Sequence, residues 1–106
     1  MKFRGGMAEL MRQASRLQRK VEKRKEELKE ELTDASAGND QVKVTVNGAG
    51  ELVSVEIDPE LLKGEDLGMA QDLVVAAANA ALKKNEEMVE AEIEKVTGGV
   101  KIPGLM

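Results

Sequence analysis

The chain has 106 residues, of which 34% are charged, and its net charge is −4. Alanine, glutamate, lysine, leucine and arginine supply 54 of these residues, a composition typical of long or coiled-coil helices. Cysteine and histidine are absent, which excludes disulfides, Cys-His and Ser-His-Asp catalysis and most zinc, copper and haem sites. We therefore expect no enzyme, no catalytic residue, no metal site and no cofactor.

The length, the aromatic content and the short apolar runs of the chain predict a small cytoplasmic protein. At this length a single domain is the limit, and Phe3 is the only aromatic residue. A small aliphatic core of this kind is often completed by a partner subunit. No apolar run approaches 18 residues, and the N-terminus has no signal-peptide core. We expect neither a membrane nor a small-molecule substrate as a partner.

Residues 7–32 are predicted to form the first helix. Its apolar residues repeat at spacings of three and four, as in a coiled coil, with Arg24 interrupting the series. These residues, named the apolar seam from here on, are Met7, Leu10, Ala14, Leu17, Val21 and Leu28. Residues 1–6 are predicted to be a flexible lead-in. Because 26 helical residues span roughly 39 Å, as much as a compact domain of this size, the helix must protrude or pack on another chain.

Residues 33–58 are predicted to form an antiparallel sheet of two to three strands. Val42, Val44 and Val46 alternate with polar residues, an Asn-Gly turn follows, and Val53 to Ile57 alternate again, which is typical of a hairpin. Residues 33–38 are a polar candidate for a third, edge strand. Such a small sheet needs a helix or another sheet on its apolar face.

A second long helix is predicted over residues 69–97. Asp58 and Pro59 mark a helical turn before it, and Gly98 and Gly99 end it. Residues 98–106 are predicted to be a flexible tail. The chain is thus expected to be one α+β domain, residues 1–106, in which a long N-terminal helix, a small antiparallel sheet and a long C-terminal helix follow one another.

Positive charge gathers in the first helix. Residues 1–30 carry ten basic and five acidic side chains, whereas the rest of the chain is acidic. Spacings of four, three and four place basic side chains on one stripe, opposite the apolar seam. We predict DNA contacts, through phosphates rather than bases, from Arg12, Arg16, Arg19, Lys20, Lys23 and Arg24. The alternative is a solvated helix face without a ligand.

Several segments resemble the YbaB/EbfC family of bacterial nucleoid-associated proteins. They are Gly5-Gly6-Met7, Leu10-Met11-Arg12-Gln13-Ala14, Val42-Lys43-Val44-Thr45-Val46-Asn47-Gly48, Val55-Glu56-Ile57-Asp58-Pro59 and Asp72-Leu73-Val74-Val75-Ala76-Ala77-Ala78-Asn79. The resemblance covers almost the full length. It implies an intertwined homodimer with helices protruding from a central sheet, binding to double-stranded DNA and a location on the nucleoid in the cytoplasm.

The function expected from the sequence is therefore that of a non-enzymatic, homodimeric nucleoid-associated protein. It binds double-stranded DNA, mainly through phosphate contacts from the basic face of its first helix. The alternative is a protein–protein adaptor in DNA replication or repair that does not touch DNA itself.

Overall fold

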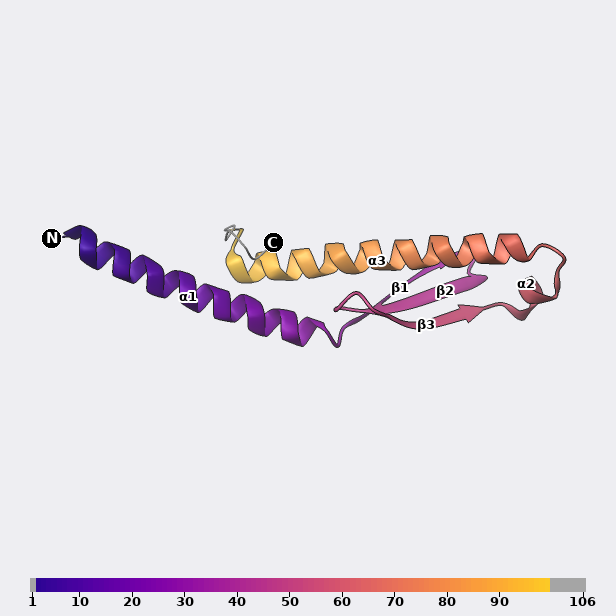
Figure 1. Ribbon diagram of the computed structural model, residues 1–106, viewed down its shortest axis with the longest axis horizontal. Coiled ribbons are helices and arrows are strands. Elements are labelled where there is room, and N and C mark those ends of the chain that lie inside the picture. Colours follow the sequence, from indigo (N-terminus) through magenta and orange to yellow (C-terminus); the bar gives the residue numbers. More distant parts are fainter. Residues whose placement is uncertain (1, 100–106) are drawn as a thin grey trace.

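The structure is a computed structural model that describes residues 2–99 (Figure 1). Along the chain lie α1 (Lys2–Leu28), β1 (Leu32–Ala37), β2 (Val42–Asn47), β3 (Leu52–Ile57), α2 (Pro59–Lys63) and α3 (Leu67–Thr97). The three strands form one antiparallel sheet in the order β1-β2-β3. The predicted α+β fold is confirmed, including its third strand at the sheet edge.

The molecule is a rod whose two ends are built from different secondary-structure elements. Its principal extents are 77 × 18 × 17 Å. The sheet and α2 lie at one end under the first part of α3, and α1 leaves the sheet in the opposite direction (Figure 1). Only the part of α1 nearest the sheet runs beside α3, and the N-terminal part continues past the end of α3 (Figure 1). The expectation that this helix protrudes is confirmed.

The core lies between α3 and the strands β1 and β2. Val42, Val44 and Val46 alternate along β2 with more exposed residues, and their side chains are fully buried. They pack against Ala77 and Ala81 of α3. Because alanine has a small side chain, the helix can approach the sheet closely, which is how a core without aromatic residues stays dense.

The first helix differs from the prediction at both ends. It begins at Lys2 rather than at residue 7, so residues 2–6, predicted to be a lead-in, are helical. Glycine weakens a helix by only about 1 kcal/mol and need not break it. At the other end the helix stops at Leu28 instead of residue 32, because β1 already begins at Leu32 and the three residues between them form a turn.

Two other helix ends, at Asp58 and Gly98, follow the predicted capping pattern. The start of α3 was not predicted: the helix begins at Leu67, two residues before the expected Met69, and Asp66 caps it. The Asp58 carboxylate accepts a hydrogen bond from the Glu60 N–H at 3.0 Å, and Asp66 does the same for the Met69 N–H. At the end of α3, Gly98 adopts a left-handed conformation with φ of 63°, and its N–H donates to the Glu94 carbonyl. Residues 100–106, most of the predicted tail, lie outside the described residues.

A close contact holds the β2–β3 turn of the sheet against the C-terminal end of α1. The Asn47 side chain closes the β2–β3 turn by accepting hydrogen bonds from the N–H groups of Ala49 and Glu51. This turn lies so near α1 that a Cβ atom on Gly48 would overlap with the Leu28 carbonyl oxygen. Only glycine fits at this position, so the turn holds the last residue of α1 in place.

Candidate nucleic-acid interface

The apolar seam of α1 is divided into a covered and an uncovered half. Near the sheet, Val21 and Leu28 are buried where α1 runs beside α3. Farther out, the Met7 and Leu10 side chains are 62% and 60% exposed. The change follows from helix lengths, because α3 ends at Thr97 while α1 continues past it (Figure 1). We call residues 6–17 the α1 tip.

Four of the predicted site residues form one surface on the exposed side of α1. Together they line a shallow hollow of about 270 Å³, and we name them the cation stripe: Arg16, Arg19, Lys20 and Lys23. The first and the last are seven positions apart, about 10 Å along the helix. Among residues 2–99, none of the four has an ion pair with an acidic side chain. Their charge is therefore directed at solvent.

The other two predicted residues have partners within the chain. The Arg12 Nη2 atom lies 2.8 Å from a Glu9 carboxylate oxygen, one turn earlier on the exposed surface. Arg24 turns toward α3, where its Nη2 atom lies 3.4 Å from Glu92 Oε1, and its Nη1 atom lies 3.5 Å from Glu27 Oε1. Arg12 thus borders the cation stripe with part of its charge compensated, and Arg24 joins the two long helices.

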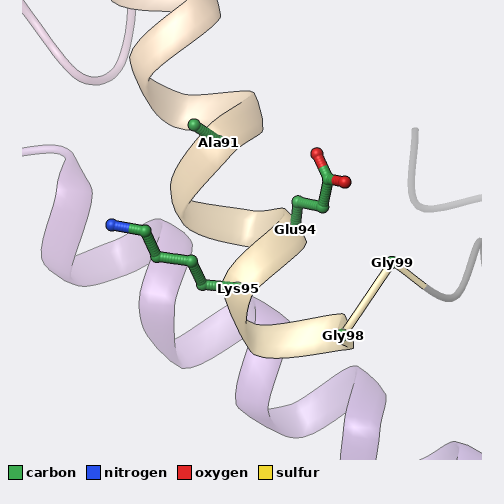
Figure 2. A pocket seen from close by; sticks show the side chains of 5 residues that line it. All are labelled: Ala91, Glu94, Lys95, Gly98 and Gly99. Carbon is green, nitrogen blue, oxygen red and sulfur yellow. The ribbon is translucent and has the colours of Figure 1, made fainter.

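The ion pair between α1 and α3 belongs to a small network at the end of α3. Glu92 also binds Lys95, whose Nζ atom lies 3.1 Å from its second carboxylate oxygen. The hydrogen bond from Lys95, together with the charges of Lys95 and Arg24, lowers the pKa of Glu92. Figure 2 shows this end of α3, where the Lys95 and Glu94 side chains point to opposite sides of the helix. The hollow between them has no converging polar groups and is a weak candidate for a ligand site.

The sheet end of the molecule carries an apolar surface that the sequence did not reveal. Val55 and Ile57 of β3 pair with Val44 and Val42, so they share the face of the sheet that α3 covers elsewhere. Because α3 packs on β1 and β2, Val55 remains 41% exposed. Beside it, an apolar hollow of about 490 Å³ is lined by Ile57, Leu62, Leu67, Ala70, Gln71, Val74 and Val75.

A buried polar residue on α3 was also missed. Asn85 follows Ala77 and Ala81 at spacings of four, on the side of α3 that packs inward. Its side chain is buried, and within the described part of the chain its Oδ1 atom has no hydrogen-bond partner. The signal was present in the sequence, because a polar residue at this spacing interrupts an otherwise small, apolar face.

Comparison with known proteins identifies the family. The profile of the YbaB/EbfC DNA-binding family matches residues 3–100, nearly the whole chain. The chain belongs to this family. A nucleoid-associated protein of Pelotomaculum thermopropionicum is 44% identical over 101 residues, which cover 95% of this chain and 96% of the relative. Another, from Alkaliphilus metalliredigens, is 46% identical over 99 residues, 93% of this chain and 87% of the relative.

A solved structure supports the fold of this YbaB/EbfC chain. The crystal structure of the uncharacterised protein HP0035 from Helicobacter pylori matches it with a TM-score of 0.63 at 28% sequence identity. The match covers 73% of this chain and 89% of the other. Membership of the family makes the present chain a DNA-binding protein, and the resemblance predicted from its segments is confirmed.

The YbaB/EbfC family is named for DNA binding and not for a reaction. Within residues 2–99 no group of three or more acidic side chains is placed to hold a metal ion. No helix of the described chain is long and apolar enough to cross a membrane. The cation stripe is a basic surface of the kind that binds nucleic acid.

Proposed function

We propose that this chain is a homodimeric, non-enzymatic protein of the bacterial nucleoid that binds double-stranded DNA through phosphate contacts from the cation stripe. The observation that carries the proposal is the set of four basic side chains on the free side of α1, none of them paired with an acidic side chain of the described chain. The names of the relatives, nucleoid-associated proteins, support the nucleoid as the location.

Phosphates suit this surface better than bases do. The cation stripe lies on a regular, convex helix, and its long side chains can adapt to the phosphates of a duplex without a fixed register. Arginine adds a planar fork that holds phosphate through two hydrogen bonds. Each contact releases counterions from DNA, which supplies affinity without sequence information. We therefore expect binding to duplexes of any sequence.

Double-stranded DNA is favoured over single strands because of what the chain lacks. Proteins that bind single strands usually stack the bases on aromatic side chains. Phe3 is the only aromatic residue in the sequence, so no stacking platform can be built. Backbone contact with a duplex needs none.

A second copy of the chain is the proposed cover for the apolar surface at the sheet end. This surface joins exposed residues of β3, α2 and the start of α3, and it is continuous with the core beneath β2. The large exposed apolar side chains there are Val55, Leu62, Leu67 and Val75. Contiguous apolar patches of this kind mark interaction sites in soluble proteins, and cyclic dimers are the commonest oligomers.

The dimer proposal is tested by mass. Light scattering at micromolar concentration should give about twice the chain mass of 11.5 kDa. Val55→Asp places a charge in the proposed interface and should yield the single-chain mass. Leu10→Gln, on the α1 tip, serves as the matched control and should leave the dimer intact. A wild-type protein that is a stable monomer contradicts this arrangement.

DNA binding is tested by its dependence on salt. Four cations from each chain give the dimer about eight phosphate contacts, so the slope of log affinity against log salt should approach about −7, at roughly −0.9 per phosphate. Arg16→Gln removes one cation per chain, which should weaken binding to all duplexes alike and flatten the slope by about 2. Titration of a fluorescent duplex at several salt concentrations measures both effects.

Lys83→Gln is the matched control for Arg16→Gln, because it removes the same charge from the exposed surface of α3. It should leave the salt slope nearly unchanged. The decisive variant replaces all four residues of the cation stripe with glutamine. If that variant stays folded and binds DNA with the affinity and salt slope of the wild type, the stripe is a solvated face and DNA is bound by another surface of the chain. A wild type that binds no duplex would instead favour the adaptor function.

A further inference from the structure

The α1 tip presents a second apolar surface, separate from the one at the sheet end. Met7, Leu10 and Met11 are each at least 60% exposed there. Met7 and Leu10 continue the same line of residues that packs against α3 nearer the sheet, where Val21 and Leu28 are fully buried. The uncovered part is thus a direct extension of a helix–helix interface whose second helix has ended.

The residues that flank this part of the seam are uncharged. In a coiled coil the two positions beside the seam decide which helix can pair, because like charges there repel. On the α1 tip these positions hold Gly6, Met11 and Gln13, and the next one, just beyond the tip, holds Gln18. The next flanking positions toward the sheet hold Lys20 and Lys25, so charge returns where α3 takes over. A second copy of the α1 tip can therefore pack against the first without electrostatic repulsion.

We propose that the α1 tips of two copies pair through their seams and thereby join two proteins that are bound to separate DNA duplexes. The inference rests on the proposed function of the cation stripe. Arg16, Arg19 and Lys23 of that stripe lie on the side of α1 opposite the seam, and Lys20 flanks the seam only beyond the α1 tip. Pairing of the tips therefore leaves the stripe of each copy accessible to DNA. One helix thus serves two partners, a second copy on its apolar side and DNA on its basic side.

The size of the seam limits where this pairing occurs. A few apolar side chains per helix make a small contact, and such contacts are weak between proteins free in solution. Several proteins bound along one duplex present several α1 tips together, and simultaneous pairing with the tips on a second duplex compensates for the weak affinity of each pair. Pairing of the α1 tips is therefore expected on DNA and not in dilute solution.

The inference is tested by capture of one duplex by another. A biotinylated 40-base-pair duplex on beads is loaded with the protein, and a fluorescent 40-base-pair duplex is then added. The wild type should retain the fluorescent duplex. The double variant Met7→Gln with Leu10→Gln should bind the first duplex as the wild type does, but retain at least tenfold less of the second. The control Ala8→Gln with Ser15→Gln alters exposed positions outside the seam and should behave as the wild type.

Each outcome bears on a different claim. A wild type that binds the first duplex but captures no second one overturns the pairing of the α1 tips and leaves the proposed function standing. A wild type that binds neither duplex overturns the proposed function. The pairing is equally overturned if the double variant captures as much as the wild type, if it no longer binds the first duplex, or if light scattering shows that it has become a monomer.

Discussion

The two long helices are similar in length, 27 residues in α1 and 31 in α3, but they are used differently. α3 is capped at both ends, and its inner face of small residues lies on the sheet. α1 is held only near its C-terminal end, by buried seam residues, by the Gly48 contact and by the ion pair with Glu92. One helix builds the domain, and the other extends from it.

This difference shows that one repeating sequence pattern can give a helix a packed part and an exposed part. The apolar residues of the seam follow one heptad spacing from Met7 to Leu28, but α3 buries them near the sheet and leaves them exposed beyond its own end. The cation stripe begins on the projecting part at Arg16 and continues onto the anchored part, where Arg24 is ion-paired with Glu92 of α3. Four substitutions test how strongly the anchored and the projecting parts of the molecule differ.

The largest effect is expected where the seam is covered. Leu28→Ala removes a fully buried side chain and should lower the free energy of unfolding by about 2–5 kcal/mol, as large-to-small core substitutions do. Leu10→Ala makes the same chemical change in the exposed half and should alter stability by less than about 0.5 kcal/mol. Urea unfolding followed by circular dichroism measures both. Equal effects would mean that the seam is uniformly packed.

The next largest effect is expected at the turn that holds the end of α1. Gly48→Ala would place a methyl group on the Leu28 carbonyl oxygen, and the backbone must shift to relieve the overlap. We expect a loss of about 1–3 kcal/mol, the usual cost of overpacking. Gly64→Ala is the control, because its Cβ would meet only ordinary contacts near 3.9 Å. An unchanged urea midpoint for Gly48→Ala would show that the turn can move away freely.

A smaller effect is expected at the end of α3. Gly98 has a positive φ that a residue with a Cβ adopts at a cost, so Gly98→Ala should destabilise the protein by about 1 kcal/mol. Among residues 2–99, no atom lies within 4 Å of the added Cβ, so the expected loss reflects backbone conformation. Thermal unfolding of the two proteins in one buffer measures it. A Tm equal to that of the wild type would show that the cap contributes nothing.

The smallest effect is expected from the ion pair between the two helices. The neighbouring Lys95 and Arg24 lower the pKa of Glu92 from its ordinary value of 4.5. Its contribution to stability is therefore present above pH 4.5 and lost as the pH falls through the lowered pKa. Wild type should melt slightly above Glu92→Gln at pH 7, and the gap should close in acid and shrink in high salt. A gap that is the same at pH 7 and pH 3 would contradict this.

The elements with strong local signals were predictable from the sequence. The alternation of Val42, Val44 and Val46 and the turn after them gave the hairpin, and Asp58 and Gly98 gave helix ends, because capping and turn geometry depend on neighbouring residues. The start of α1 was placed five residues late, since two adjacent glycines resemble a linker. Their helical conformation depends on the residues on both sides and not on glycine itself.

Features that depend on contacts between residues far apart in the chain were harder to predict from the sequence. The spacing placed Arg16, Arg19 and Lys23 on one stripe, and whether this stripe binds DNA stays a prediction. Arg24 was grouped with them, although it stands at a seam position between Val21 and Leu28. That interruption was the available sign that it meets another helix, but its partner Glu92 lies 68 positions away along the chain. Likewise, alternation in β3 predicted an apolar face but not that α3 would leave it uncovered.

The rod shape of the chain has a consequence for how it moves in solution. Its radius of gyration is 20.4 Å, which is the value expected of a compact globule of about 350 residues. Diffusion and gel-filtration volume respond to this dimension and not to mass. A single chain should therefore tumble and elute as a much heavier particle, with a frictional ratio well above that of a sphere. Combining sedimentation with diffusion separates the shape from the number of chains.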